Sequence, residues 1–371
     1  MTTGSGALEL THPGGVTTIR VGNGVLGKAV ADAGDLFVGR SIYAVSSPAV
    51  LELHGSALAP LAEAAAAFTL LDVPDGEEAK QIPVVERLWE RLASGGGKRD
   101  SVVVAFGGGS VGDVAGFAAA TFLRGVAYVQ IPTTLLAQVD AAIGGKTGID
   151  LAAGKNLVGA FHHPRCVISD TCFLATLPVA ELRSGLVEAI KMAALFDVGL
   201  MDRIESDFER LCGGDPEALA PVVRAAAAIK VAVVGRDPAE RGDRQLLNYG
   251  HTLGHALEAA GDYSWLRHGE AVGWGMRFAH RLARRRGADE SFLSRLEQLL
   301  DRLQLPVPAA ADLSRLLELI ARDKKARSGG LTWVLPLSPG LGERVEGISW
   351  DVVEEELNGF LRDLAARRAN I

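Results

Sequence analysis

Cysteine is scarce in this sequence, which limits the kinds of site the chain can build. The 371 residues include three cysteines, Cys166, Cys172 and Cys212. Their odd number and the absence of CxxC spacing argue against a disulfide framework and against a zinc site made of thiolates. Any metal would therefore be held by histidine and carboxylate side chains.

Runs of positive charge are short as well. No run of Lys or Arg is longer than Arg284-Arg285-Arg286, and the formal net charge is −7. The chain lacks the electrostatic footprint of a protein that grips a nucleic-acid backbone, so we expect no nucleic-acid partner. A hydrophobic fraction of 48% excludes a disordered chain.

The longest apolar stretches that we considered are interrupted early. Glu63 breaks the first, and Asp113 and Arg124 bracket the second, so we expect no membrane span. The opening residues contain no basic stretch followed by an apolar core, so we expect no signal peptide. The sequence predicts a cytoplasmic protein.

The first half of the chain alternates strand and helix signals. Runs rich in β-branched residues at 41–45, 68–73, 102–106 and 126–132 predict strands, and a helix starting near Val111 joins the last two. Strands separated by helices indicate right-handed crossovers and a parallel sheet. After about Pro178 the apolar residues recur at helical spacing, and 331–335 is the one strand we expect there. Chains of this length usually form two domains, which we place at 1–177 and 178–371.

A glycine-rich turn follows the predicted strand at 102–106. Gly107, Gly108 and Gly109 precede a helix, and glycines at such a turn let the backbone approach a phosphate, which the helix dipole favours. The pattern is not GxGxxG followed by an acid about 20 residues later. A dinucleotide site and a plain tight turn are both compatible with it.

A second glycine-rich stretch runs from Asp140 to Gly148 and is followed by Lys155 and Asn156. Gly144-Gly145-Lys146-Thr147 is similar to the end of a Walker A loop, but Asp140 stands where that loop needs its first glycine, which disfavours an ATPase. Two lysines and an amide among glycines suit an anionic substrate. Solvated surface lysines explain them equally well.

Histidines and a glutamate are candidate metal ligands. His251 and His255 lie one helical turn apart, His268 follows a short loop, and Glu188 belongs to an earlier amphipathic helix. Zinc accepts two imidazoles and a carboxylate and keeps the fourth position open for chemistry. Thr252 stands where the HExxH motif needs Glu, which disfavours a metalloprotease. A packed or surface histidine pair is the alternative.

Polar residues also precede the histidine helix. Arg244 and Asn248 are four residues apart and would present a guanidinium and an amide on one face, with Lys230 on the preceding helix. A charged helix surface is the alternative, and a solvated turn is our default expectation for 322–325.

Together these stretches resemble the 3-dehydroquinate synthases, the shikimate-pathway members of the sugar-phosphate cyclases. The resemblance covers most of the chain and is carried by long motifs: DGEEAK (75–80), the stretch from GGGSVGDVAG to NLVGAF (107–161), LRSGLVEAIKMA (182–193), LLNYGHTLGHALEA (246–259), RHGEAVGWGM (267–276) and DKK (323–325). It implies an N-terminal Rossmann-like α/β domain that binds NAD, an all-α C-terminal domain that binds zinc or cobalt, and a homodimer.

The resemblance also implies roles for individual residues. Three of them would hold the metal: Glu188, His251 and His268. A second group would contact NAD: Glu77, Lys80, Gly108, Gly109, Asp113, Thr133, Thr134, Asp140, Lys146 and Lys155. A third group would surround the substrate: Lys146, Lys155, Asn156, Lys191, Lys230, Arg244, Asn248, His255 and Lys325, with Arg124 reaching the phosphate site of the other subunit.

The implied reaction converts 3-deoxy-D-arabino-heptulosonate 7-phosphate into 3-dehydroquinate and phosphate. It proceeds by transient oxidation with NAD, elimination of phosphate, reduction, ring opening and intramolecular aldol closure, so NAD is not consumed. Three alternatives stay open. The chain could cyclise sedoheptulose 7-phosphate, act as a metal-dependent polyol dehydrogenase, or be a catalytically silent NAD-binding regulator, although such a regulator needs no metal triad.

Overall fold

The computed structural model describes residues 6–152, 154–326 and 331–369, with the backbone alone for residues 323–326. The chain forms two compact units: Met1–Leu182 with Glu209–Pro238, and Arg183–Phe208 with Ala239–Ile371. The sequence suggested a single boundary between 177 and 178. The units differ from that division because the segment 209–238 returns to the first unit, where its helix packs on the sheet.

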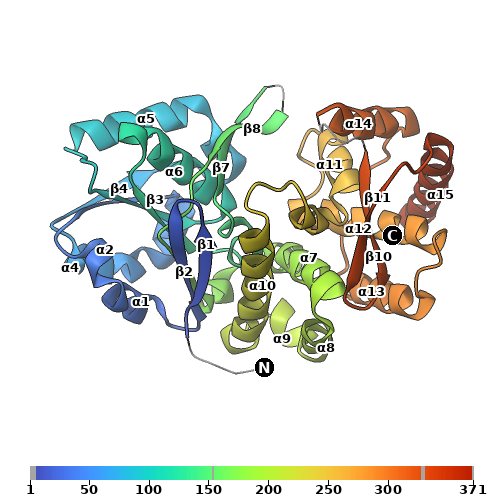
Figure 1. Ribbon diagram of the computed structural model, residues 1–371, viewed down its shortest axis with the longest axis horizontal. Helices are drawn as coiled ribbons and strands as arrows, with labels where there is room; N and C mark the ends of the chain where they lie inside the picture. Colours follow the sequence, from blue (N-terminus) through green and yellow to red (C-terminus); the bar gives the residue numbers. More distant parts are fainter. Residues whose placement is uncertain (1–5, 153, 327–330, 370–371) are drawn as a thin grey trace. The chain divides into compact units, whose positions relative to one another are not determined.

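A seven-stranded sheet lies at the centre of the first unit, in the order β1-β2-β9-β6-β5-β3-β4 (Figure 1). Its strands are β1 (Leu8–His12), β2 (Gly15–Gly22), β3 (Ser41–Ser46), β4 (Ala67–Asp72), β5 (Val102–Gly107), β6 (Ala127–Pro132) and β9 (Cys166–Asp170). All neighbours pair in parallel except β1 and β2, which form a hairpin. The four strands expected in the first half are thus confirmed, while β1, β2 and β9 were not expected.

Helices cover both faces of this sheet. The helices and helical turns of the unit are α1 (Leu26–Asp32), α2 (Gly34–Phe37), α3 (Pro48–His54), η1 (Gly55–Leu58), α4 (Ala59–Ala64), η2 (Gly76–Lys80), α5 (Ile82–Ser94), α6 (Gly109–Thr121), η3 (Phe122–Arg124), η4 (Ala137–Ala141), η5 (Thr171–Thr176) and α10 (Pro216–Arg236). In β3, Tyr43 and Val45 pack with residues of α5 and α6, whereas Ile42 and Ala44 pack with residues of α1, α2 and α4. Successive side chains of a strand point to opposite faces, so a sheet buried on both sides needs this continuous apolar sequence.

Strands β7 (Lys146–Leu151) and β8 (Gly154–Phe161) form a separate antiparallel hairpin that packs on α6. The second glycine-rich stretch of the sequence leads into this hairpin. Gly144 and Gly145 have φ angles of 115° and 68°, a backbone conformation that favours glycine. A turn into a strand pair therefore accounts for these two glycines.

Helix α10 is long and apolar enough, by length and composition, to cross a membrane. From the sequence we placed Lys230 on this helix but did not weigh the stretch as a membrane span. The helix lies along β1 and β2 (Figure 1), where Ala227 and Val234 share one buried cluster with Leu10 and Ile19. Half of its apolar window is buried within the fold. Packing against the edge of the sheet thus accounts for its apolar composition.

The second unit is mostly helical. Its elements are α7 (Val179–Phe196) and α9 (Phe208–Cys212), which each cross a unit boundary, α8 (Val198–Ser206), η6 (Asp243–Asn248), α11 (His251–Ala260), α12 (His268–Arg284), α13 (Glu290–Arg302), α14 (Leu313–Ala326), β10 (Thr332–Ser338), β11 (Leu341–Glu346) and α15 (Trp350–Ala369). Almost every residue of α12 is buried, because α11, α13, α15 and β10 all pack against it.

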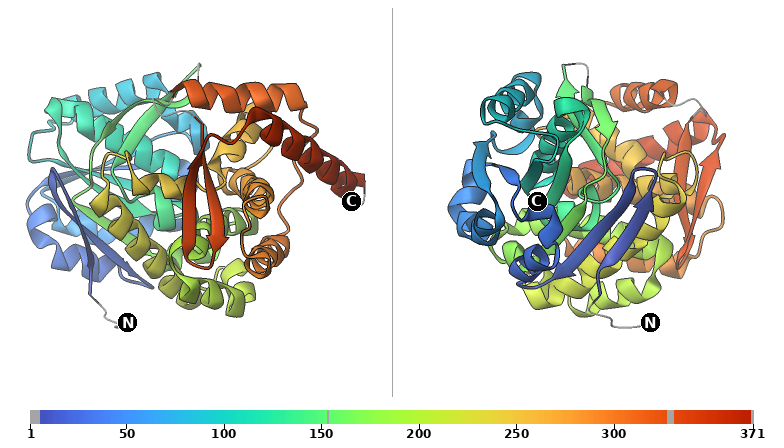
Figure 2. Two further views of the ribbon diagram at one scale, coloured as in Figure 1. Left: turned by 45° about the vertical axis from the view of Figure 1, so that its right-hand side comes forward. Right: turned by 60° about the vertical axis from the view of Figure 1, so that its left-hand side comes forward.

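The strand expected at 331–335 is confirmed as β10, but the expectation that it stands alone was wrong. Strand β11 pairs with it in an antiparallel hairpin, drawn in red in Figure 2. Along β11 only Val345 is buried, and the other residues are polar, glycine or exposed. Such an edge strand leaves little hydrophobic pattern for sequence analysis to detect.

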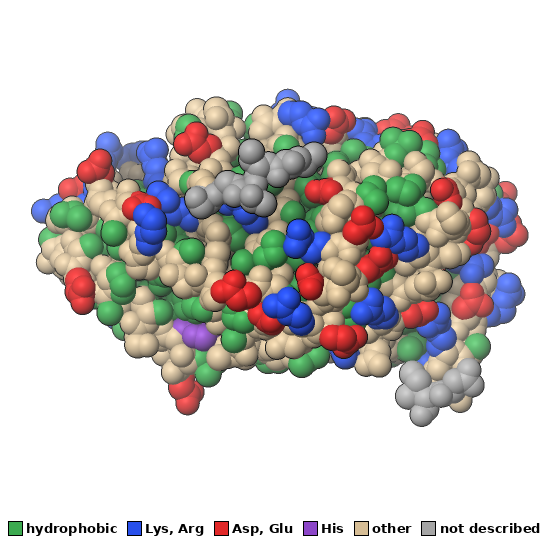
Figure 3. Space-filling model, turned by 90° about the horizontal axis from the view of Figure 1, so that it is seen from below, with side chains coloured by type: hydrophobic (Ala, Val, Ile, Leu, Met, Phe, Trp, Pro, Cys, Tyr) green, Lys and Arg blue, Asp and Glu red, His purple; other side chains and the backbone are tan. Residues whose placement is uncertain are grey.

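Surface charges of both signs are interspersed on the face that Figure 3 draws. Many arginines of the second unit lie beside acids, as Arg285 does with Glu355 at 2.7 Å and Arg284 with Glu290 at 3.0 Å. Exposed pairs of this kind contribute little to stability, since water screens them. They account for much of the charged composition of the chain.

Candidate active site

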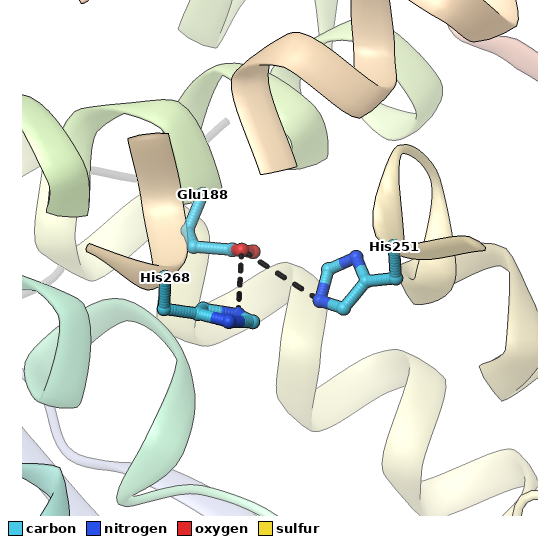
Figure 4. Close-up of side chains that lie close together, drawn as sticks. All are labelled: Glu188, His251 and His268. Carbon is cyan, nitrogen blue, oxygen red and sulfur yellow. Dashed lines mark ion pairs between the residues drawn. The ribbon is translucent and has the colours of Figure 1, made fainter. Parts of the chain in front are cut away.

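Three side chains of the second unit converge on one point (Figure 4). Glu188 from α7 lies with its Oε1 atom 3.8 Å from His251 Nε2 and 3.5 Å from His268 Nε2. The potential ligand atoms of all three lie within 4.8 Å of one another. Ligands about 2.1 Å from a tetrahedral ion lie roughly 3.4 Å apart, so small shifts would suffice to hold a metal. These are the three residues that the resemblance assigned to the metal.

The local sequence explains this convergence. His251 is the first residue of α11 and His268 the first of α12, so both imidazoles lie at helix starts. The amide of Gly269 donates to Ser184 Oγ at 3.1 Å, which ties the first turn of α12 to α7, the helix that carries Glu188. The two histidine helices also pack closely on each other.

The carboxylate of Glu188 is the most unusual group in this cluster. It is fully buried, and within the described part of the chain neither oxygen accepts a hydrogen bond of ordinary geometry. The ammonium of Lys191, itself 1% exposed, contacts one of the oxygens as an ion pair. A buried carboxylate normally has several donors, so these oxygens fit a cation that is coordinated directly.

Electrostatics favour an anion at Glu188 and a neutral ring at His251. Burial raises the pKa of the Glu188 carboxyl, but Lys191 and His268 together outweigh it and bring the pKa to about 2. Burial holds the pKa of His251 well below its usual range. Burial also lowers the pKa of His268, yet Glu188 and Glu258 raise it further, to about 10. The carboxylates of Glu188 and Glu258 thus favour a positive charge beside His268, and a bound divalent cation would supply such a charge.

Each imidazole uses its other nitrogen for a contact that fixes its orientation. His251 Nδ1 lies 3.2 Å from the backbone oxygen of Tyr249, so this nitrogen donates and Nε2 keeps its lone pair. His268 Nδ1 lies 3.4 Å from Glu258 Oε2. Outer partners of this kind accompany most metal-bound histidines. Sequence analysis missed Glu258, although its position two helical turns after His251 could have indicated it.

His255 lies beside the triad. Its ring centre is 5.2 Å from that of His251 and 6.1 Å from that of His268. His255 also forms a second group with Glu258 and His268 whose ligand atoms are close enough to hold a metal ion. The exposed position of His255 contrasts with the burial of Glu188 and His251. Its expected role as a proton carrier stays a prediction.

Other residues expected around the substrate are also found in the second unit. Arg244 in η6 is 2% exposed, and the Asn248 amide donates to Glu240 Oε1 at 3.0 Å. Glu240 was not predicted from the sequence; its φ of 56° marks a local turn that no motif indicated. The side chain of Lys325 lies outside the described part of the structure.

In the first unit, the turn at Gly107 to Gly109 connects β5 to α6 at the carboxyl edge of the sheet. Strand β3 has β4 on one side and β5 on the other, so the strand order reverses here, and ligands of open α/β sheets bind at such reversals. Within the described residues no side chain caps α6, so its first N–H groups suit an anion. Thr133, which follows β6, donates its amide to the Gly107 oxygen at 2.9 Å and Thr134 follows it.

Lys80 is the centre of a polar cluster beside this turn. Its ammonium is 2.9 Å from Asp113 Oδ2, 3.7 Å from Asp150 Oδ1 and 3.8 Å from Glu77 Oε2, and it also contacts Asn156 Oδ1. Burial lowers the pKa of Lys80, but the three carboxylates outweigh that effect and raise it. The structure thus brings together three residues expected to bind NAD and one expected to bind substrate.

The same cluster holds the β7–β8 hairpin. Lys155 Nζ lies 3.1 Å from Glu77 Oε1, and Asp150 accepts the Asn156 amide at 2.7 Å, where Asn156 has a φ of 56°. Asp150 was not predicted, because its contacts with Lys80 and Asn156 depend on the tertiary fold. Lys155 and Asn156, which we expect to contact ligands, therefore also attach the hairpin to the rest of the unit.

The remaining expected residues are distributed over the first unit. The Lys230 ammonium of α10 contacts both the carboxylate and the backbone oxygen of Asp140 in η4. Lys146 is exposed at the start of β7. Arg124 is exposed at the end of η3, with a φ of 67°.

Solved structures define the class of protein to which this arrangement belongs. A 2-epi-5-epi-valiolone synthase from Streptomyces hygroscopicus, with NAD⁺ and Zn²⁺ bound, matches with a TM-score of 0.84 and 30% identity over 94% of this chain and 96% of that chain. A 2-deoxy-scyllo-inosose synthase with carbaglucose-6-phosphate, NAD⁺ and Co²⁺ matches with a TM-score of 0.84 and 26% identity over 94% and 99%. An iron-containing alcohol dehydrogenase, TM-score 0.70 at 18% identity, shares the fold alone. The fold is that of the sugar-phosphate cyclases.

Sequence comparisons narrow this class to one family. The model of the 3-dehydroquinate synthase N-terminal region matches residues 70–184, and that of the C-terminal region matches 185–326. The curated 3-dehydroquinate synthase of Geobacter metallireducens is 45% identical over 86% of this chain and 89% of its own length, and that of Symbiobacterium thermophilum is 44% identical over 87% and 91%. The chain belongs to the 3-dehydroquinate synthase family.

Proposed function

We propose that this chain converts 3-deoxy-D-arabino-heptulosonate 7-phosphate into 3-dehydroquinate and phosphate, with NAD and a divalent metal as cofactors. The observation that carries the metal is the cluster of Glu188, His251 and His268 around a buried carboxylate without ordinary hydrogen bonds. Curated relatives at 42–45% identity carry the activity. Zinc and cobalt are both candidates, since each occurs in a similar structure.

The two cofactors would use separate units. NAD would bind at the carboxyl edge of the sheet, with its phosphates at the start of α6 and polar contacts from Asp113 and Glu77. Glu188, His251 and His268 would hold the metal. When bound, NAD supplies a hydride acceptor that later returns the hydride, and the metal supplies a Lewis acid for the substrate hydroxyl.

The chain's own residues would bind the substrate and move its protons. The substrate has a carboxylate and a phosphate, and the cations proposed to neutralise them are Lys146, Lys155, Lys191, Lys230, Arg244 and Lys325. Asn156 and Asn248 would orient its hydroxyl groups. His255 would accept and donate protons, because it lies beside the metal cluster, where a positioned imidazole can act as a general acid or base.

We also propose a homodimer in the cytoplasm. In that assembly Arg124 would reach the phosphate site of the partner subunit. Size-exclusion chromatography with light scattering tests the dimer, and Arg124→Ala tests the shared site: kcat should fall while the mass stays that of a dimer.

The reaction itself is tested by phosphate release. Purified protein with Zn²⁺ or Co²⁺ and the heptulosonate phosphate should release one phosphate per substrate with NAD present at a tenth of the substrate concentration. If one NADH accumulates per substrate, the protein is a dehydrogenase and the proposal fails. Turnover of sedoheptulose 7-phosphate in preference to the heptulosonate would instead assign a different cyclase.

A further inference from the structure

A row of polar side chains in contact with one another begins beside the metal cluster and leads outward through the second unit, and the proposed reaction makes no use of it. Its inner members are buried, Glu297 is half-buried and Asp301 is exposed. Tyr249 and His280 are both 0% exposed, and the Tyr249 hydroxyl contacts His280 Nε2. His280 Nδ1 lies 2.7 Å from Glu297 Oε1. Glu297 in turn contacts Arg277, which lies 2.8 Å from Asp301. Buried polar groups need hydrogen-bond partners, and here the partners form one continuous row from Tyr249 to Asp301.

The proton positions in this row follow from its acceptors. The Glu297 carboxylate accepts hydrogen bonds, so His280 Nδ1 carries the proton and His280 Nε2 is the acceptor. Burial lowers the pKa of His280, although Glu297 opposes it, which favours the neutral ring. The Tyr249 hydroxyl must then donate to Nε2. Tyr249 is therefore held in one orientation by a hydrogen bond whose direction is fixed.

The backbone of Tyr249 connects this row to the metal cluster. Its carbonyl oxygen accepts from His251 Nδ1 at 3.2 Å, and that contact leaves Nε2 toward Glu188. The next residue, Gly250, has a φ of 81°, and a Cβ there would lie 2.6 Å from the Val272 oxygen of α12. The segment from Tyr249 to His251 therefore meets α12 at two points: the Tyr249 side chain contacts His280, and the Gly250 backbone lies close to Val272.

We propose that Tyr249 and His280 are positioning residues of the metal site, which act through the Tyr249 carbonyl to hold His251 with Nε2 toward the metal. Helix α12 then orients both histidine ligands. It carries His268 at its first residue, and about three turns later it carries His280, which orients His251 through Tyr249. The distance between the two imidazoles depends on this one helix.

The experiment measures metal affinity rather than turnover, since the inference rests on the metal centre proposed above. Apo protein is titrated with Zn²⁺ against a chromophoric chelator for Tyr249→Phe, His280→Leu and the double variant. Tyr249→Phe deletes one oxygen atom and keeps the ring. Loss of an outer partner of a metal ligand weakens binding by roughly 10- to 100-fold, and we expect about 10-fold for each single variant because the effect is indirect. The double variant should lose no more than either single one.

Tyr43→Phe is the matched control. Tyr43 is 1% exposed and its hydroxyl donates to the Gly95 oxygen at 2.7 Å in the first unit, so its loss should lower thermal stability by a similar amount and leave Zn²⁺ affinity unchanged. In Co²⁺-loaded protein the visible ligand-field spectrum should change for Tyr249→Phe and not for Tyr43→Phe.

Two results would overturn the inference. Unchanged Zn²⁺ affinity and an unchanged Co²⁺ spectrum in Tyr249→Phe would make the pair purely structural. Single losses that multiply in the double variant would show that Tyr249 and His280 act independently. If the wild-type protein itself binds no Zn²⁺, the proposed metal centre fails, and that result is distinct from both of these.

Discussion

The two units each contain a buried ionic cluster, and the two clusters are built in opposite ways. In the first unit the centre is a cation, Lys80, which has Asp113, Asp150, Glu77 and Asn156 around it. In the second unit the centre is an anion, Glu188, whose oxygens accept no ordinary hydrogen bond within the described residues. The Lys80 ammonium has three carboxylates around it, whereas the Glu188 carboxylate has the Lys191 ammonium as an ion-pair partner but accepts no hydrogen bond of ordinary geometry. The difference supports our proposal that the second cluster binds a metal ion, while the first holds residues that we propose to contact ligands.

The largest effect should follow from removing the central anion. Glu188→Gln keeps the size of the side chain but loses the negative charge, so bound Zn²⁺ should fall below a tenth of an equivalent after chelator dialysis. Because the metal stabilises charge by several kcal/mol, kcat should fall roughly 10³-fold or more. Elemental analysis and phosphate release measure the two effects. A variant with full metal content would show that the ion binds elsewhere.

The next largest effect should come from His255, whose replacement distinguishes a residue that transfers protons from one that binds the metal. His255→Asn should retain one metal ion per chain while turnover slows about 10²- to 10⁴-fold, the usual range for loss of a positioned acid or base. His268→Ala, in contrast, should lose the metal. The two variants are compared by metal content after identical dialysis. A metal-free His255→Asn protein beside a loaded His268→Ala protein would exchange the two roles and assign the ion to the second candidate group.

The third prediction breaks the cluster in the first unit. Lys80→Met removes a buried cation and leaves the half-buried carboxylates of Asp113 and Asp150 without it. Loss of one partner of a fully buried pair lowers the free energy of unfolding by about 3–5 kcal/mol, so we expect a loss at the lower end of that range or below it. Affinity for NAD should fall as well, but metal content should not. Lys28→Met is the control, since Lys28 forms an exposed ion pair with Asp32 and should change the free energy of unfolding by less than about 1 kcal/mol. Denaturant titration compares them; equal effects would show that the Lys80 cluster is not a structural centre.

The smallest effect concerns acid pH. His280 is buried beside Tyr249, Glu297, Arg277 and Arg284, and burial lowers its pKa below 6.5. A lowered histidine pKa means that the unfolded chain binds the proton more strongly, so stability is present above pH 6.5 and is lost as pH falls through the folded pKa. This one group contributes a slope of at most about 1.4 kcal/mol per pH unit. Denaturant titrations from pH 7 to 5 should show a shallower decline for His280→Gln than for wild type; parallel curves would contradict this prediction.

Much of the fold could be predicted because its signals are local. The strands at β3, β5 and β6 are continuous apolar runs, and a parallel sheet covered on both faces needs such runs. Strands β7 and β8 gave no such run, because β8 mixes half-buried and exposed residues and the glycines before β7 resemble the end of a phosphate loop. The return of α10 to the first unit could not be predicted either, because an apolar helix face fits any core and the strands that it packs on, β1 and β2, were themselves unexpected.

The candidate site likewise contains residues that the sequence indicated and residues that it did not. Residue type and spacing indicated His251, His255, His268 and Glu188 as candidate ligands, and the resemblance assigned three of them to the metal. Sequence analysis missed the partners that orient these ligands, among them Glu258 and the Tyr249 carbonyl, because a single acid on a helix or a backbone oxygen has no motif. It also missed the ion pairs that Lys80 and Lys230 form with the chain, which depend on tertiary contacts.

We propose that a metal ion completes the cluster around Glu188, whereas the cluster around Lys80 needs none. Anomalous diffraction from crystals of Zn²⁺-loaded protein, recorded on both sides of the zinc absorption edge, would locate the ion. We expect one strong peak per chain, about 2.1 Å from Glu188 Oε, His251 Nε2 and His268 Nε2, and none among Lys80, Asp113 and Asp150. A peak bound by His255, Glu258 and His268, with Glu188 uncoordinated, would contradict it.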